Sequence, residues 1–299
     1  MKITITGSLG HISKPLTEKL IQQGHEITLI SSNPEKEADI KALGAKPAIG
    51  SLEDLIFLTG AFTGADAVYT MVPPNNYFDH SLDLLAYYRR LGGNYARAIV
   101  KSGVKRVVNL STIGAHLKQG SGILIGAHDI EHMLNDLSPE IAVTHMRPTS
   151  FYYNLYGYVD MIKKEGLIAV NYGSEALIPW VAPTDIAAAV AEEIATPLTG
   201  RKIRYVASEE LTGNEVARIL GAAIEKPDLK WVIVSDEQTQ QGLEAIGMNP
   251  DIAAGLVEMY ASLHSGSLSE DYYRNRPAVM GKVKMSDFAV EFAAAFHQK

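Results

Sequence analysis

The chain has 299 residues, 46% of them hydrophobic and 20% charged, which is enough to bury a large core in one or two domains. Its formal net charge of −7 argues against a nucleic-acid-binding face, and its apolar runs fall short of the roughly 20 residues that span a bilayer. The lack of cysteine excludes disulfides, thiolate catalysis and cysteine-ligated zinc. No charged and apolar leader precedes the first strand pattern, so we expect no signal peptide and a cytoplasmic protein.

A β-branched run, a glycine turn and a helical pattern open the chain, in that order. Residues 2–6 predict a strand, the turn contains Gly7 and Gly10, and apolar residues then recur at helical spacing. This order is typical of a dinucleotide-binding βαβ unit, although Ser13 stands where the usual third glycine lies. A plain strand–helix turn is the alternative. The residues predicted to hold the cofactor phosphates are Gly7, Gly10, His11 and Ile12.

A second strand over residues 26–30 ends at Ser31, Ser32 and Asn33, where such folds contact the adenosine ribose. A carboxylate there would select NAD and an arginine would select NADP, but this chain has neither. Two hydroxyls, a helix N-terminus and the nearby Lys36 favour a phosphate, so we expect NADP rather than NAD. The alternative is that Asn33 is only a helix cap.

The next strands are predicted over residues 45–49 and 65–72, with Ser51 as the cap of a helix between them. The apolar strand over residues 65–72 runs into a stiff, proline-containing loop at the edge of the sheet where ligands bind. In this loop we expect Val72, Pro73 and Pro74 to bound the cofactor, and Tyr77 and Phe78 to border the substrate. A hydrophobic loop packed on its own helix is the alternative.

A helical pattern from residue 82 ends at Gly103, and strands over 105–110 and 141–146 follow. The strand ends place Ser111 and Pro148 at the same edge of the sheet, where we expect the backbone after Pro148 to hold the nicotinamide of the cofactor and Phe151 and Tyr152 to line the substrate pocket. His128 and His132 share one helix face, but Asp129 replaces the glutamate of a zinc-binding helix, so we expect no metal site. Ser111 and His128 are the candidate catalytic groups. The alternative for Ser111 is that it only caps the end of its strand. The alternative for Phe151 and Tyr152 is that they belong to an aromatic core.

Beyond residue 155 the alternation of strands and helices loosens. Strands are predicted over 167–171, 203–206 and 230–234, and an alanine-rich helix over 183–195 is expected to pack back on the sheet. Further amphipathic helices are predicted over 211–223, 236–246 and 250–264. The predicted fold is α/β, a Rossmann-type doubly wound parallel sheet in residues 1–154, with a smaller C-terminal α/β substrate domain in residues 155–299.

Several of these segments together are similar to the NmrA-like proteins, a family of atypical short-chain dehydrogenase/reductases, and in particular to their NAD(P)H:quinone oxidoreductase-like branch. The segments that carry the resemblance are residues 6–10, 72–75, 104–114, 146–148 and 180–187. The resemblance implies a Rossmann domain that binds NAD(P)H beside a smaller substrate domain. The chain departs from the family pattern at Ser13, Ser32, Ser51 and His132. The position of His132 often carries lysine in the family.

The Tyr-x-x-x-Lys pair of short-chain dehydrogenases is absent, because none of the 14 tyrosines has a lysine four residues later. Hydride transfer to a quinone depends mainly on proximity and orientation, and His128, a tyrosine or water would supply the proton. The resemblance thus implies an NAD(P)H-dependent reductase of a quinone or similar small carbonyl acceptor. The alternative is a non-catalytic NAD(P)-binding redox sensor that acts through a protein partner. A nucleotide-sugar epimerase ranks lower, because it needs the missing pair.

Overall fold

Seven parallel strands form the central sheet of the computed structural model, which describes residues 1–298, in the order β10–β6–β5–β4–β1–β2–β3. The chain order reverses between β1 and β4, which is the arrangement of a doubly wound Rossmann sheet and confirms the predicted fold class. The strands are β1 (Lys2–Ile5), β2 (Glu26–Ser31), β3 (Lys46–Ile49), β4 (Ala67–Thr70), β5 (Arg106–Leu110), β6 (Ala142–Pro148) and β10 (Arg201–Val206).

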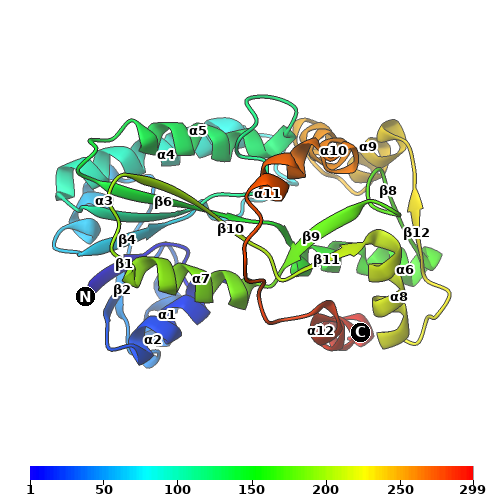
Figure 1. The fold of residues 1–299 in the computed structure, drawn as a ribbon, viewed down its shortest axis with the longest axis horizontal. Coiled ribbons are helices and arrows are strands. Elements are labelled where there is room, and N and C mark those ends of the chain that lie inside the picture. The colour runs from blue at the N-terminus through cyan, green and yellow to red at the C-terminus, as the bar shows by residue number, and fades with distance from the viewer. Residues whose placement is uncertain (299) are drawn as a thin grey trace.

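Helices cover both faces of this sheet (Figure 1). One face carries α1 (Ser13–Gln22), α2 (Glu37–Ala42) and α7 (Pro183–Ala195), and the other carries α3 (Leu55–Phe62), α4 (Leu84–Ser102) and α5 (Ile125–Asn135). Leu16 and Val190 pack under the first face, and Leu91 and Ile130 under the second, all of them fully or almost fully buried. Buried apolar strands with a core on each side are what a parallel sheet requires.

Local sequence explains where the helices of the second face begin and how closely they pack. The Asp54 side chain caps α3 by accepting bonds from two backbone amides, whereas Ser51, the predicted cap, holds only the preceding turn. Gly92 brings α4 against α5, since a Cβ there would lie 2.7 Å from Ile130. Gly103 ends α4 in the left-handed conformation, as predicted.

The C-terminal half forms a second lobe at the carboxyl ends of the sheet strands (Figure 1). Two small sheets, β11–β9–β7 and β12–β8, pack with helices there. The strands are β7 (Ser150–Phe151), β8 (Leu167–Val170), β9 (Leu177–Val181), β11 (Glu209–Thr212) and β12 (Lys230–Ile233). The helices are α6 (Val159–Glu165), α8 (Gly213–Ala223), α9 (Asp236–Ala245), α10 (Pro250–Ser265), α11 (Glu270–Arg274) and α12 (Met285–His297), and 3₁₀ turns lie at Pro34–Lys36, Gly122–Leu124, Tyr152–Tyr158 and Ser267–Ser269.

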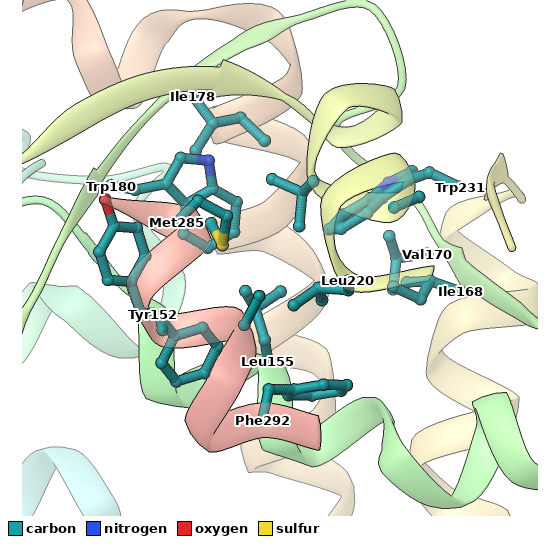
Figure 2. Packing of buried hydrophobic residues seen from close by; sticks show 14 of the residues in the cluster. Tyr152, Leu155, Ile168, Val170, Ile178, Trp180, Leu220, Trp231, Met285 and Phe292 are labelled. Carbon is teal, nitrogen blue, oxygen red and sulfur yellow. The ribbon is translucent and has the colours of Figure 1, made fainter. Parts of the chain in front are cut away.

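An aromatic core holds this lobe together. Figure 2 shows Tyr152, Trp180 and Phe292 converging with aliphatic residues from several elements. The two lobes are not separate in the sequence, because α7 and β10 come from the second half of the chain and complete the first lobe. Among the described residues no helix is both long and apolar enough to cross a membrane.

Candidate functional site

The turn between β1 and α1 is built around Gly7, whose φ is +94°. A Cβ at this position would lie 2.5 Å from Ser13 Oγ and 2.9 Å from Met71 Sδ, so the site has no room for one. The buried Ser13 hydroxyl donates a 2.8 Å hydrogen bond to the carbonyl of Thr6. This bond joins helix to strand and explains how serine serves at the third glycine position.

The N-terminus of α1 is open to an anion. No side chain caps the helix at Ile12, and its first turn contains no acidic residue. The first amides of a helix lack partners within the helix and carry the positive end of its dipole. Gly10, whose amide bonds the Gly7 carbonyl at 3.1 Å, is exposed and leaves the approach free of a side chain. These groups fit the diphosphate of a dinucleotide.

At the end of β2, two of the three predicted ribose-contacting groups are already engaged within the protein. The Ser31 hydroxyl accepts a 2.9 Å bond from Ser8, and the Asn33 side chain caps the following 3₁₀ turn through the amide of Glu35 at 2.9 Å. Ser32 is exposed, and its hydroxyl has no hydrogen-bond partner within residues 1–298. Ser32 is therefore the free polar side chain at this strand end.

Two partly buried hydrogen bonds fix the chain where it leaves β4 toward Val72, Pro73 and Pro74. The amide of Met71 donates to Thr6 Oγ1 at 2.9 Å, and the Tyr95 hydroxyl donates to the Met71 carbonyl at 2.6 Å. The predicted cofactor-bounding segment thus begins beside the glycine turn, since Thr6 directly precedes Gly7.

Asn249, at the start of α10, holds the loop that follows. Its amide donates to the carbonyl of Tyr77 at 2.9 Å, and its side-chain nitrogen donates to the carbonyls of Asp79 at 3.0 Å and Leu82 at 3.3 Å. Its side-chain oxygen meanwhile caps α10. Tyr77 is half-buried against this helix, whereas Phe78 is 51% exposed. Tyr77 is therefore packed against the protein, whereas Phe78 faces solvent.

The Ser111 hydroxyl does not present itself at the strand edge, contrary to its expected role as a substrate contact. It donates a 2.5 Å bond to buried Glu131, which also forms a two-pronged ion pair with Arg147 at 2.9 and 2.6 Å. Arg147 reaches on to Asp271 at 2.9 Å. Burial opposes the charge on Arg147, but the hydrogen bonds and charge of Glu131 outweigh it and raise the arginine pKa. Ser111 therefore belongs to a structural network that joins α5, β6 and α11.

His128 has a fixed tautomer. Its Nδ1 lies 2.8 Å from the carbonyl of Ala115, and because a carbonyl only accepts, Nδ1 carries the hydrogen. In the neutral ring, Nε2 then carries the lone pair and can accept a hydrogen bond. His132 repeats the pattern on the carbonyl of His128 at 3.0 Å, with the two ring centroids 4.1 Å apart.

The segment after β6 sends two adjacent tyrosines into different surroundings. Tyr152 is 1% exposed and stacks between Trp180 and Phe288 in the core of the C-terminal lobe, so it does not line a substrate pocket as expected. Tyr153 instead stacks on His11 of the glycine turn, with ring centroids 5.0 Å apart, and Phe151 lies beside it at 5.2 Å. The Pro148 carbonyl accepts a 2.8 Å bond from the amide of Ile113.

The structure thus brings together the glycine turn, the end of β4 and Tyr153, while the Ser111 hydroxyl belongs to the ion-pair network and Tyr152 to the core of the C-terminal lobe. Sequence analysis did not single out Tyr153, which stacks on the glycine turn, because nothing in the local sequence distinguishes it from Tyr152. Both lie in the 3₁₀ turn Tyr152–Tyr158, where neighbouring side chains point about 120° apart, and the local sequence does not show which of the two faces the core. Asn249 was missed because its partners lie about 170 positions earlier in the chain.

Comparison with known proteins agrees with this architecture. The sequence profile of the NmrA-like family matches residues 1–270. NAD(P)H azoreductase from Xenophilus azovorans is 26% identical over 297 residues, covering 98% of this chain and 99% of the azoreductase. Two solved structures superpose at 19% identity with a TM-score of 0.79 each. NADPH-dependent quinone oxidoreductase QOR2 from Escherichia coli, complexed with NADPH, covers 97% of this chain and is itself covered to 99%. Triphenylmethane reductase from Citrobacter sp. covers 99% and is covered to 100%. Because the family profile spans most of the sequence, this chain belongs to the NmrA-like family.

Proposed function

We propose that the protein is an NAD(P)H-dependent oxidoreductase that reduces a quinone, an azo compound or a similar small acceptor by hydride transfer. The observation that carries this proposal is the turn at Gly7, which has no space for a side chain and leads into a helix N-terminus with no cap. The end-to-end similarity to an NAD(P)H azoreductase supports the acceptor class.

NADPH is the proposed cofactor, with NADH as the alternative. The free hydroxyl of Ser32 lies at the end of β2, and no carboxylate stands among residues 31–33 to repel an adenosine phosphate. The quinone oxidoreductase from Escherichia coli was solved with NADPH bound, which supports the same preference. Lys36 contributes less than the sequence suggested, because it pairs with Asp39 at 3.7 Å on the surface.

The bound nicotinamide supplies the hydride, and the chain supplies position and a dry environment. We propose that Val72, Pro73 and Pro74 hold the nicotinamide side of the cofactor, with Pro148 across from them, and that residues 155–299 provide the substrate side. His128 is the proposed proton source, through Nε2, when the ring is charged. We propose no direct role for Ser111, because its hydroxyl donates to Glu131.

Stopped-flow oxidation of NADPH and NADH with a panel of quinones and azo dyes tests the proposal. Turnover at ordinary enzyme rates with at least one acceptor, faster with NADPH, is the expected result. Tight cofactor binding without turnover of any acceptor would rule the reductase out.

The second candidate is a redox sensor that binds NAD(P) and signals through a protein partner. Two observations favour it: the Tyr-x-x-x-Lys pair is missing, and the serine after β5 is committed to a buried ion-pair network. A protein partner that is captured only with one redox form of the cofactor would support the sensor. Steady turnover would argue against it.

A further inference from the structure

Three tyrosines from different elements have hydroxyls that form no hydrogen bond within the described chain. Tyr77 lies in the loop after β4, Tyr88 on α4, and Tyr153 in the 3₁₀ turn after β7. All three residues are half-buried, and none of the hydroxyls has a hydrogen-bond partner within residues 1–298. These hydroxyls are also not among the fully buried polar atoms that lack a hydrogen-bond partner in the described chain, so part of each hydroxyl is accessible. Each hydroxyl therefore keeps a donor and an acceptor available to something outside the protein.

Packing brings these side chains close together. Tyr77 and Tyr88 lie against the same apolar cluster around Leu84 and Met248. The Tyr88 ring also covers Gly126 on α5, where a Cβ would come within 2.6 Å of it. Burial and then the neighbouring Tyr77 hydroxyl raise the pKa of both Tyr88 and Tyr153. The phenols consequently stay protonated at neutral pH and act as hydrogen-bond donors.

The group borders the position proposed for the nicotinamide. Tyr153 stacks on His11, within the turn proposed to bind phosphate, at 27° between the ring planes. Tyr77 follows the proposed cofactor-bounding prolines by only a few residues, in a loop held by Asn249. Gly126, beneath Tyr88, precedes His128 by two positions on α5. The three phenols thus come from three different elements, all close to residues proposed to bind the cofactor or supply the proton.

On the basis of the proposed function, we propose that Tyr77, Tyr88 and Tyr153 form the acceptor site, and that it takes a planar aromatic acceptor whose reducible oxygen or nitrogen atoms accept hydrogen bonds. The aromatic rings offer flat apolar surface to such a molecule. The hydroxyls stabilise negative charge as it develops on the heteroatom during reduction.

The chemistry balances without ionising a tyrosine. The acceptor gains a hydride from the reduced cofactor, which becomes oxidised, and a proton from His128, the proposed proton source, that completes the reduced product. The three tyrosines donate hydrogen bonds and keep their own protons, in contrast to the lysine-activated tyrosine of short-chain dehydrogenases.

Three single variants, Tyr77→Phe, Tyr88→Phe and Tyr153→Phe, remove one hydroxyl each and keep the rings. Tyr156→Phe is the matched control, because Tyr156 is also half-buried but packs on Phe288 and Phe292 in the C-terminal core. Binding of 1,4-naphthoquinone to the cofactor-free protein is measured by equilibrium dialysis, and turnover with NADPH is measured in parallel.

Each site variant is expected to weaken naphthoquinone binding about fivefold, as the loss of one hydrogen bond implies, and to leave NADPH affinity unchanged. The control should bind like wild type. Cyclohexane-1,4-dione, which carries two carbonyls without an aromatic plane, should bind wild type at least about tenfold more weakly than naphthoquinone.

Wild-type affinity in all three site variants, or equal affinity for the two diketones, would overturn the inference. The proposed function fails separately. If wild type binds naphthoquinone through these hydroxyls yet never oxidises NADPH, the site stands and the reductase does not. If turnover persists unchanged in the three variants, the reductase stands and this site does not.

Discussion

Replacement of Gly7 by alanine tests the glycine turn in two independent ways, through stability and through cofactor affinity. An alanine at φ +94° adopts a left-handed conformation that costs about 1–2 kcal/mol. Its methyl group would also lie 2.5 Å from Ser13 Oγ, so the serine has to rotate away. Rotation breaks the 2.8 Å bond to the Thr6 carbonyl and leaves a buried acceptor unpaired.

The loss of that hydrogen bond adds roughly 1–3 kcal/mol, and we expect Gly7→Ala to lower the unfolding free energy by about 2–5 kcal/mol in all. Met71 contributes little to the cost because the flexible end of its side chain can move. Gly24→Ala is the matched control: its φ is +81°, but a Cβ there meets no atom within 4 Å. The control should therefore lose only the conformational cost of about 1–2 kcal/mol.

Urea unfolding measures the stability of both variants, and fluorescence titration measures their affinity for NADPH. Gly7→Ala should weaken NADPH binding at least about tenfold, because the helix amides can no longer approach the diphosphate, while Gly24→Ala should bind like wild type. Equal loss of stability in the two variants would refute the steric argument. Unchanged NADPH affinity in Gly7→Ala would refute the assignment of the turn.

Ser111→Ala should lose about 1.5–3 kcal/mol of stability in urea unfolding, as expected for a bond to buried Glu131, while turnover persists; a loss of turnover without a loss of stability would return Ser111 to the active site. His145 is buried, and burial lowers its pKa from 6.5 to about 4. The unfolded chain therefore binds the extra proton first, so the folded state should lose up to about 3 kcal/mol as pH falls from 6.5 to 4. His145→Gln should reduce this acid sensitivity in unfolding experiments at several pH values, and an identical pH profile would contradict the linkage. Asn249→Asp keeps the cap of α10 but removes two donors to the loop, so hydrogen exchange over residues 77–82 should accelerate at least about tenfold. The exposed substitution Gln241→Glu adds the same charge nearby and should leave exchange unchanged; equal exchange in both would show that Asn249 is not the tether.

The fold was predictable because its determinants are local. Runs rich in β-branched and apolar residues, most of them followed within a few positions by glycine or proline, mark the strands of the central sheet, and their alternation with helical patterns leads to a parallel order. The expectation that residues 183–195 pack back on the sheet is confirmed by α7, which lies against α1. The strands of the second lobe were harder to predict. β9 and β11 went unpredicted because they are short and take their partners from distant segments.

The site was less predictable than the fold, because side-chain partners lie far away in the sequence. Ser111 lies at the end of β5, as predicted, but its hydroxyl donates to Glu131, which pairs with Arg147. Arg147 in turn contacts Asp271, 124 positions later in the chain. No sequence motif predicts such a network. Tyr152 and Tyr153 differ only in which side of the chain they face. The glycine turn was found from sequence because backbone conformation at Gly7 demands one residue type.

A crystal structure of the NADPH complex tests the central claim most directly. The diphosphate is expected within hydrogen-bond distance of the backbone amides between Gly10 and Ser13, with the nicotinamide extending toward Tyr77 and Tyr153. A nucleotide bound at another edge of the sheet, or a diphosphate that contacts no amide of this turn, would contradict the account.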